Sequence, residues 1–381
     1  MSLWRADMVE VIEVKTAKDI KEFIEFPLRL YRGCEFFVPP LYSDEKKLLK
    51  SGGNTPDAES VFFLAKRNGK TVGRIHGIVQ KKYNFEHNAK QVRFTRFDSL
   101  NDSEISRALL SAVEIWGQQK GMEEMVGPLG FTDLDREGLL IDGFSEDSTF
   151  EEQYNYDYYA GLIEDFGFVK DVDWVEYELR SPEKRNPMLK RVAERALEIN
   201  KLHVASTDLP KKKYIEKYRD GLFNCIHKCY SHLYGTMELS RATQDELIDQ
   251  FMMIVNKEFL VCICDESDNV VGFGLCLPGI GCAVKKSGGR LTPAALARIL
   301  KTVKNPEVID LALVAILPEY QMSGANAILI DGILDILERG SVKKCETNLN
   351  LETNTAVQAQ WKYFDARQHK RRRAYTKAIG E

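Results

Sequence analysis

The sequence predicts an α+β protein of two similar halves, each with a mixed, mostly antiparallel sheet flanked by helices. Its 381 residues suit two or three domains of ordinary size. Each half contains two β-rich runs around polar turn residues, at 61–76 and at 259–275, which is the pattern of a hairpin. A further strand and an amphipathic helix follow each hairpin, and this alternation is too irregular for a TIM barrel.

In the first half, a short apolar segment at Val9–Val14 precedes a helical pattern, and the hairpin turns at Arg67–Gly69. The next elements are predicted as a strand over 92–97 and a helix over 103–119.

The second half repeats this order, with an apolar segment at Leu202–Ser206 and a hairpin that turns at 265–269. The elements predicted after this hairpin are a strand over 308–317, a helix over 323–338, a strand over 343–351, a helix over 355–364 and a closing strand over 370–379.

The boundary between the halves is predicted at Ser181–Pro187, a polar stretch with two prolines, which gives domains at 1–181 and 188–381. Residues 1–180 hold 23 Lys/Arg against 33 Asp/Glu, and the rest of the chain holds 30 against 24. Net charges of −10 and +6 favour the second half for an anionic ligand, although two ordinary solvated surfaces would show the same numbers.

The composition favours a cytoplasmic protein. No apolar run approaches the roughly 18 residues of a membrane span, and we see no secretory signal. The eight cysteines are scattered, several within apolar runs, which is not a disulfide framework.

The most informative stretch is 310–330, where a buried strand runs into Pro318, a tight loop and an apolar helix. Free N–H groups at the helix start would attract an anion such as a pyrophosphate, and Gly324 would allow close approach to the backbone. The stretch lacks the Lys-Ser/Thr of a P-loop and the three glycines of a dinucleotide fingerprint. A plain strand–loop–helix turn is the alternative.

This stretch resembles the GNAT acyltransferases, which carry Gln/Arg-x-x-Gly-x-Gly/Ala after their fourth strand. Here Ile316–Tyr320 precedes Gln321-x-x-Gly324-x-Asn326, with Asn326 where Gly or Ala is usual. Segments along both halves also resemble a bacterial subgroup of uncharacterised GNAT-like proteins. These segments are Val38–Leu41, Val72–Ile75, Gly127–Pro128, Gly138–Phe144, Gly289–Pro293 and Lys370–Lys377.

The resemblance implies an N-acyltransferase that moves an acyl group from acetyl-CoA or another acyl-CoA to the amine of a small molecule or peptide. It implies no metal, no nucleic acid and no membrane partner, and it allows a homodimer. The residues that it assigns to the cofactor are Ala315, Ile316, Gln321, Met322, Ser323, Gly324, Ala325, Asn326 and Asn354.

The first half is interpreted as a degenerate GNAT domain without an acyl-CoA site. The acidic segment Asp98–Glu104 stands where the pyrophosphate loop belongs, and its carboxylates would repel phosphates. The first half would then form one wall of the substrate cleft. Asp133 and Asp135 would reach that cleft, with a solvated loop as the alternative.

The catalytic residues are less clearly indicated. Many GNAT enzymes place a tyrosine acid seven residues after the asparagine matched by Asn354, but Trp361 stands there. Tyr363 or Tyr375 would have to replace it, and Asp310 is the candidate base, with packing residues and a strand-edge carboxylate as the alternatives.

Two further patterns are assigned to structure. Cys225, Cys229 and His232 share one face of a helix over 212–233, which fits core packing better than zinc. The basic run His369–Arg373 alternates along a strand and fits a solvated face or the rim of the CoA site. Two other functions stay open. One is a CoA-binding sensor or scaffold without activity. The other is a transferase that uses aminoacyl-tRNA, against which the pI of about 6.0 argues.

Overall fold

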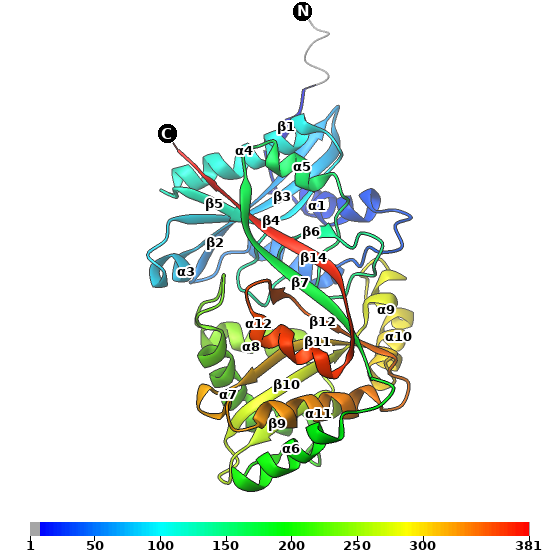
Figure 1. The fold of residues 1–381 in the computed structure, drawn as a ribbon. Helices are drawn as coiled ribbons and strands as arrows, with labels where there is room; N and C mark the ends of the chain where they lie inside the picture. The colour runs from blue at the N-terminus through cyan, green and yellow to red at the C-terminus, as the bar shows by residue number, and fades with distance from the viewer. Residues whose placement is uncertain (1–7, 381) are drawn as a thin grey trace, which may run out of the picture. The chain divides into compact units, whose positions relative to one another are not determined.

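The computed structural model describes residues 8–380, which divide into two units (Figure 1). Unit 1 holds residues 8–174, 281–295 and 370–380, and unit 2 holds 175–280 and 296–369. This division differs from the predicted 1–181 and 188–381, because 281–295 and the end of the chain lie with the first half. No helix in residues 8–380 has the length and hydrophobicity needed to cross a bilayer.

Unit 1 is a mostly antiparallel sheet with helices. Its strands are β1 (Glu10–Glu13), β2 (Ala58–Arg67), β3 (Lys70–Gln80), β4 (Gln91–Ser99), β5 (Glu124–Gly127), β6 (Leu139–Asp142), the first half of β7 (Val169–Arg180) and most of β14 (Asp365–Ala378). Its helices are α1 (Ala17–Leu30), α2 (Tyr42–Ser51), α3 (Lys81–Glu86), α4 (Ser103–Gln119), α5 (Tyr159–Glu164) and α9 (Gly281–Lys285). The order β1-β2-β3-β4-β5-β14 is antiparallel except between β4 and β5.

Unit 2 repeats this plan. Its strands are the second half of β7, β8 (His203–Val204), β9 (Leu260–Cys264), β10 (Val270–Pro278), β11 (Val308–Ile316), β12 (Lys344–Thr347) and β13 (Asn350–Leu351). Its helices are α6 (Pro187–Ile199), α7 (Lys211–Tyr230), α8 (Arg241–Phe251), most of α10 (Pro293–Lys304), α11 (Ala325–Leu337) and α12 (Thr355–Gln358). The order β8-β9-β10-β11-β12-β7 is antiparallel except between β11 and β12.

The α+β class and the mostly antiparallel sheets are therefore confirmed. About half of the predicted elements lie within two residues of the observed ones, whereas the closing strand predicted over 370–379 begins five residues earlier, at Asp365. The predicted helix over 355–364 is shorter than expected, because α12 has four residues and continues as a 3₁₀ turn over Ala359–Tyr363. The predicted strand over 343–351 is two short strands, β12 and β13.

The main correction concerns the closing strands. The last strand of the second half, β14, pairs with β5 of unit 1, where Tyr375 stands opposite Gly127. The last strand of the first half, β7, pairs with β12 of unit 2, where Leu179 stands opposite Cys345. Each sheet is thus completed by a strand from the other half of the sequence. Lys370, Arg372 and Tyr375 of β14 are at most 1% exposed, so this strand belongs to the interior of unit 1.

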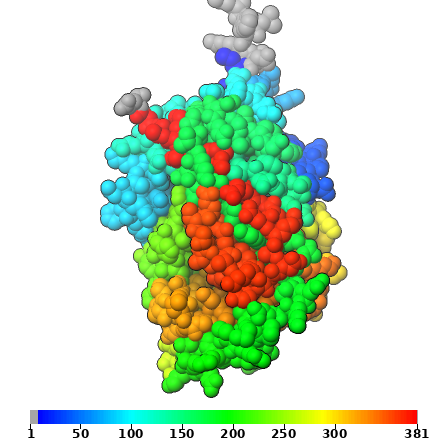
Figure 2. Space-filling model, viewed as in Figure 1, coloured from blue at the N-terminus to red at the C-terminus, as the bar shows by residue number. Residues whose placement is uncertain are grey.

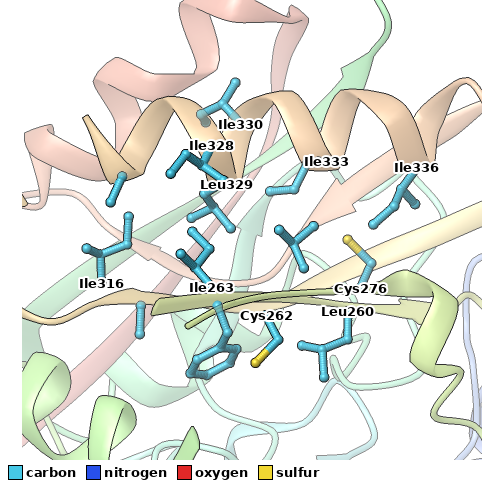
Figure 3. Close-up of a cluster of buried hydrophobic side chains, with 14 of the residues drawn as sticks. Leu260, Cys262, Ile263, Cys276, Ile316, Ile328, Leu329, Ile330, Ile333 and Ile336 are labelled. Atoms are coloured by element: carbon cyan, nitrogen blue, oxygen red, sulfur yellow. The ribbon is translucent and has the colours of Figure 1, made fainter. Parts of the chain in front are cut away.

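The core of unit 2 lies between its sheet and α11 (Figure 3). Leu329, Ile333 and Ile336 point from this apolar helix towards Ile263 and Cys276 of the strands, and all five are at most 2% exposed. Burying such side chains is worth about 1.5–3 kcal/mol each.

Helix α7 packs on the opposite face of the sheet. Cys262 points away from α11, and Cys264 shares its face because strand side chains alternate. Val270 pairs with Cys264, and Gly221 and Cys225 of α7 lie against Val270. The sheet of unit 2 is therefore covered on both faces, by α11 and α7.

We predict that fragments 1–181 and 188–381 do not fold separately, because each lacks the strand that completes its main sheet. Each fragment expressed alone should show no cooperative thermal transition, whereas co-expression should restore a complex with the transition of the full chain. Full-length protein nicked at residues 182–186 after folding is the control and should stay associated. A lone fragment that unfolds cooperatively would contradict the strand exchange.

Candidate active site in unit 2

The parallel strands β11 and β12 pair over only four residues and then separate. The register runs from Val308 opposite Lys344 to Leu311 opposite Thr347, and Asn348 adds a last backbone bond to the Leu311 carbonyl at 3.1 Å. A β-bulge follows, because Leu311 and Leu313 face successive residues of β10 and Ala312 is the extra residue. A bulge bends its strand. Beyond Ala312, no described strand pairs with the edge of β11 that faces away from β10.

Side chains cover this free edge of β11. The Tyr230 hydroxyl lies 2.9 Å from the carbonyl oxygen of Val314 and 3.2 Å from its amide nitrogen. The Ile316 carbonyl, which is the next one on this edge, accepts hydrogen bonds from the Cys229 thiol and the Gln321 side-chain amide, each at 3.2 Å. Ile316 and Gln321, both assigned to the cofactor from the sequence, are therefore in contact. Ala315, which lies between Val314 and Ile316 in the strand, pairs with Phe273 of β10.

The loop after β11 ends in an uncapped helix. Pro318–Tyr320 forms a 3₁₀ turn, Gly324 has φ +87°, and α11 begins at Ala325 without a side-chain cap. Within the described part of the chain, the N–H groups of Gly324, Ala325 and Asn326 donate no hydrogen bond. Uncapped N–H groups and the helix dipole together favour an anion at this end.

The structure gives Gly324 a packing role. A Cβ atom there would lie 3.0 Å from the Cβ of Ala196 on α6, and positive φ is strained for other residues. Asn200 of α6 also binds the Ser323 carbonyl at 3.0 Å. In the space-filling view, the orange surface of the α11 start and its loop lies beside the green surface of α6 (Figure 2). Met322, another predicted cofactor residue, is 98% exposed.

Three carboxylates line up across neighbouring strands below the point of separation. Asp310 of β11 stands opposite Glu346 of β12, and Glu346 stands opposite Glu178 of β7, so all three side chains share one face. They are 5%, 4% and 7% exposed. The Lys344 ammonium lies 2.9 Å from Glu178 and 2.6 Å from Glu346, and Nε2 of His369 lies 2.8 Å from Glu346.

Cationic partners keep Glu178 charged. Burial alone would raise the pKa of Glu178, but hydrogen bonds from Lys344 and Arg180 outweigh it and lower the pKa to about 2. The row of carboxylates raises the pKa of Lys344 against the opposing effect of burial. Asp310 is two residues from the bulge at Ala312, so its carboxylate lies at the base of the strand separation, where a general base would be useful.

Sequence reasoning selected Asp310 but missed Glu346, Glu178, His369 and Tyr230. The short strand Lys344–Thr347 is mostly polar, so nothing local singled out Glu346. No local signal marked Tyr230, because its role depends on where α7 ends.

Three further residues named in the sequence analysis lie at or just after α12. Asn354 caps α12 and accepts the Val357 amide at 3.3 Å. Trp361 is 4% exposed and packs edge-on against Phe364. Tyr363 is partly buried against the same core, and its hydroxyl makes no hydrogen bond with a described residue.

Comparisons with known proteins agree with this architecture. No family model matches the chain. Protein YghO of Escherichia coli K12 is 24% identical over 371 residues, covering 95% of this chain and 93% of that protein. A bacterial ceramide synthase of Caulobacter vibrioides is 23% identical over 380 residues, covering 97% and 98%.

Among solved structures, a tandem GNAT protein from the clavulanic acid biosynthesis pathway matches 98% of this chain and 99% of its own. The TM-score is 0.55 at 12% identity. The chain has the tandem GNAT fold. A GCN5-related glucosamine N-acetyltransferase region of a fungal multi-domain β-N-acetylglucosaminidase also matches, with a TM-score of 0.58 at 11% identity over 97% of this chain and 38% of that one.

The two GNAT units differ at the helix that follows the bulged strand. In unit 1 this helix is α4, and Asp102 caps it by accepting the Glu104 amide at 2.9 Å. Arg67 binds Asp102 and Glu104, each at 2.7 Å. Asp98, grouped with them from the sequence, instead lies within β4 and is buried against Arg74 at 2.7 Å. The start of α4 therefore carries a carboxylate cap and two carboxylates paired with Arg67.

The cysteines that the sequence grouped are bound to backbone. Cys225 faces the Val270 carbonyl and Cys229 the Ile316 carbonyl, and burial raises the pKa of both thiols, to about 12 for Cys225. All eight cysteines are unpaired. Elsewhere in residues 8–380, the side-chain atoms of His203, Cys264 and Asp268 that could bind a metal ion lie within 4.8 Å of one another.

We predict that Glu178→Gln lowers stability in a pH-dependent way. A lowered carboxylate pKa contributes stability above the unfolded value of 4.5, and this contribution is lost as the pH falls towards 2. A shift of this size corresponds to at most about 3 kcal/mol. Urea unfolding should therefore show the variant clearly weaker than wild type at pH 6, with the gap nearly closed at pH 2.

The control is Glu307→Gln, which removes an exposed ion pair with Lys343 and should change stability little at any pH. A gap between Glu178→Gln and wild type that stays constant from pH 6 to pH 2 would show that Glu178 does not contribute through its charge.

Proposed function

We propose that this protein is an N-acyltransferase that takes an acyl group from acyl-CoA in unit 2 and transfers it to an amine. The observation that carries the proposal is the combination, in one unit, of a strand edge freed at Ala312 and an uncapped helix start at Ala325. Unit 1 has a bulged strand too, but Asp102 and Glu104 fill its helix start. Unit 1 is therefore proposed as a GNAT domain without a donor site.

The two features suit the two ends of a CoA thioester. The pyrophosphate would lie against the N–H groups of Ala325 and Asn326, where the helix dipole favours negative charge. The pantetheine arm carries two amides, which pair with a free strand edge as another strand would, along Val314 and Ile316. This places the thioester towards Ala312 and Asp310. Acetyl-CoA is the simplest donor, and longer acyl groups remain within the proposal.

The reaction needs little from the protein beyond position and a base. The amine nitrogen attacks the thioester carbonyl, the new C–N bond forms, and the C–S bond breaks to release the CoA thiolate. Asp310 takes the amine proton, directly or through water. With Trp361 at the usual tyrosine position, water protonates the thiolate, because a thiol with a pKa near 8.5 is a good leaving group. Positioning of the two substrates then supplies most of the rate enhancement.

The acceptor is an amine of a small molecule or peptide. The similarity to a ceramide synthase over nearly the whole chain favours including one further class. A ceramide is the amide of a long-chain amino alcohol and a fatty acid, so this class is a long-chain amine with a long-chain acyl-CoA.

Activity is tested with acyl-CoAs of increasing chain length against a panel of small, peptide and long-chain amines, with thiol release as the readout. Binding of acyl-CoA without turnover on any amine would favour a CoA-binding scaffold. Transfer that requires a charged tRNA would favour the aminoacyl-tRNA alternative.

We predict that Asn326→Asp weakens CoA binding at least tenfold without harming the fold. The change keeps the side-chain shape and adds a negative charge in the first turn of α11, where it stabilises the helix and repels phosphate. Asn186→Asp, at the cap of α6, is the matched control and should leave the CoA affinity unchanged. Calorimetric titration measures both. Equal CoA affinity for wild type and Asn326→Asp would show that the pyrophosphate does not bind at the start of α11.

We predict that Asp310→Asn slows turnover more at neutral pH than at high pH, where the free amine is already abundant. Tyr363→Phe should change turnover by less than twofold, because its hydroxyl has no described partner and the proposal gives it no role. A hundredfold loss of turnover in Tyr363→Phe, at unchanged CoA affinity, would show that Tyr363 acts as the general acid.

A further inference from the structure

The hydroxyl of Tyr230 is bound to both backbone groups of one residue on the free edge of β11. It donates to the Val314 carbonyl at 2.9 Å and accepts from the Val314 amide at 3.2 Å. Tyr230 is the last residue of α7, on the opposite face of the sheet from α11. A single side chain thus takes the place that a neighbouring strand would have.

This contact has a physical cause. Buried backbone N–H and C=O groups need partners, and β12 has already turned away at this level of the sheet. Tyr230 hydrogen-bonds to Val314, and Cys229 hydrogen-bonds to the Ile316 carbonyl. Two consecutive residues of α7 therefore provide the hydrogen-bond partners of this edge. The covered groups are the ones that the proposed function assigns to the pantetheine arm.

Tyr230 and a bound donor therefore exclude each other. The Val314 N–H group has one hydrogen to donate, and it now donates it to the Tyr230 hydroxyl. A carbonyl oxygen of the donor would need the same hydrogen. We propose that the Tyr230 hydroxyl competes with the donor for the edge of β11 and that acyl-CoA must displace it. The inference rests on the proposed function and adds a residue that sets the affinity for the donor.

The position of Tyr230 allows this displacement. Helix α7 ends there, and the Ser231 amide returns to the His227 carbonyl at 3.2 Å. The following segment is tied to the helix end by Thr236, whose hydroxyl binds the Tyr230 carbonyl at 2.9 Å. The Tyr230 side chain is half-buried, so its ring can turn away while the backbone bonds of α7 stay intact.

The competition lowers the apparent affinity for the donor by the fraction of molecules in which the edge is open. Tyr230→Phe removes the competing hydroxyl but keeps the ring. The ligand-free variant loses the partner of two partly buried backbone groups, whereas the loaded variant loses nothing. Its affinity for acyl-CoA should therefore rise, about three- to tenfold, and its thermal midpoint should fall only in the absence of ligand.

The test titrates CoA and acetyl-CoA into wild type, Tyr230→Phe and Tyr218→Phe by calorimetry, with thermal midpoints in parallel. Tyr218 is the matched control, because it lies on the same helix and its hydroxyl binds Asp268 at 3.2 Å, away from β11. Tighter binding by Tyr230→Phe alone, with midpoints that match wild type only when ligand is bound, supports the proposal.

Unchanged or weaker binding by Tyr230→Phe overturns the proposal while the proposed function stands. Unchanged affinity with a large fall in turnover also overturns it, because Tyr230 would then act on the reacting atoms. If neither wild type nor Tyr218→Phe binds any acyl-CoA, the proposed function fails and the inference fails with it.

Discussion

The candidate site depends on the point at which β11 and β12 stop pairing. Four parallel residue pairs hold the strands together, and the bulge at Ala312 then bends β11. On the edge away from β10, no described strand pairs with Val314 or Ile316. Each feature proposed for the site in unit 2 depends on this separation of β11 and β12. The free edge needs a partner, the loop beyond it leads into an uncapped helix, and the carboxylate of Asp310 lies at the base of the separation.

The two units share one fold but differ in a few residues at one helix start. Both have a bulged strand followed by a helix, but the start of α4 is filled by Asp102 and Glu104 with Arg67, whereas α11 has neither a cap nor a carboxylate in its first turn. Strand order is the same in both, and each sheet is completed by the last strand of the other half of the chain. The two units are thereby linked in folding.

The sequence predicted the fold class and the central elements of each half because hydrophobic periodicity and hairpin turns are local signals. Helix 103–119 matches α4, and the strand over 308–317 matches β11 within one residue. The exchange of β7 and β14 was not predictable in this way, since the partner of an edge strand depends on contacts far apart in the chain. The loop at 321–326 could be selected from its motif, but the packing of Gly324 on α6 and the Tyr230 contact depend on tertiary structure.

The central claim is that unit 2 alone holds the donor, along the free edge of β11 and at the start of α11. A crystal structure with bound CoA tests it most directly. The account predicts the pyrophosphate at the N–H groups of Ala325 and Asn326, the pantetheine amides paired with Val314 and Ile316, and the Tyr230 hydroxyl displaced from Val314. CoA bound at α4 of unit 1, or bound in unit 2 with the Tyr230–Val314 hydrogen bonds intact, would contradict it.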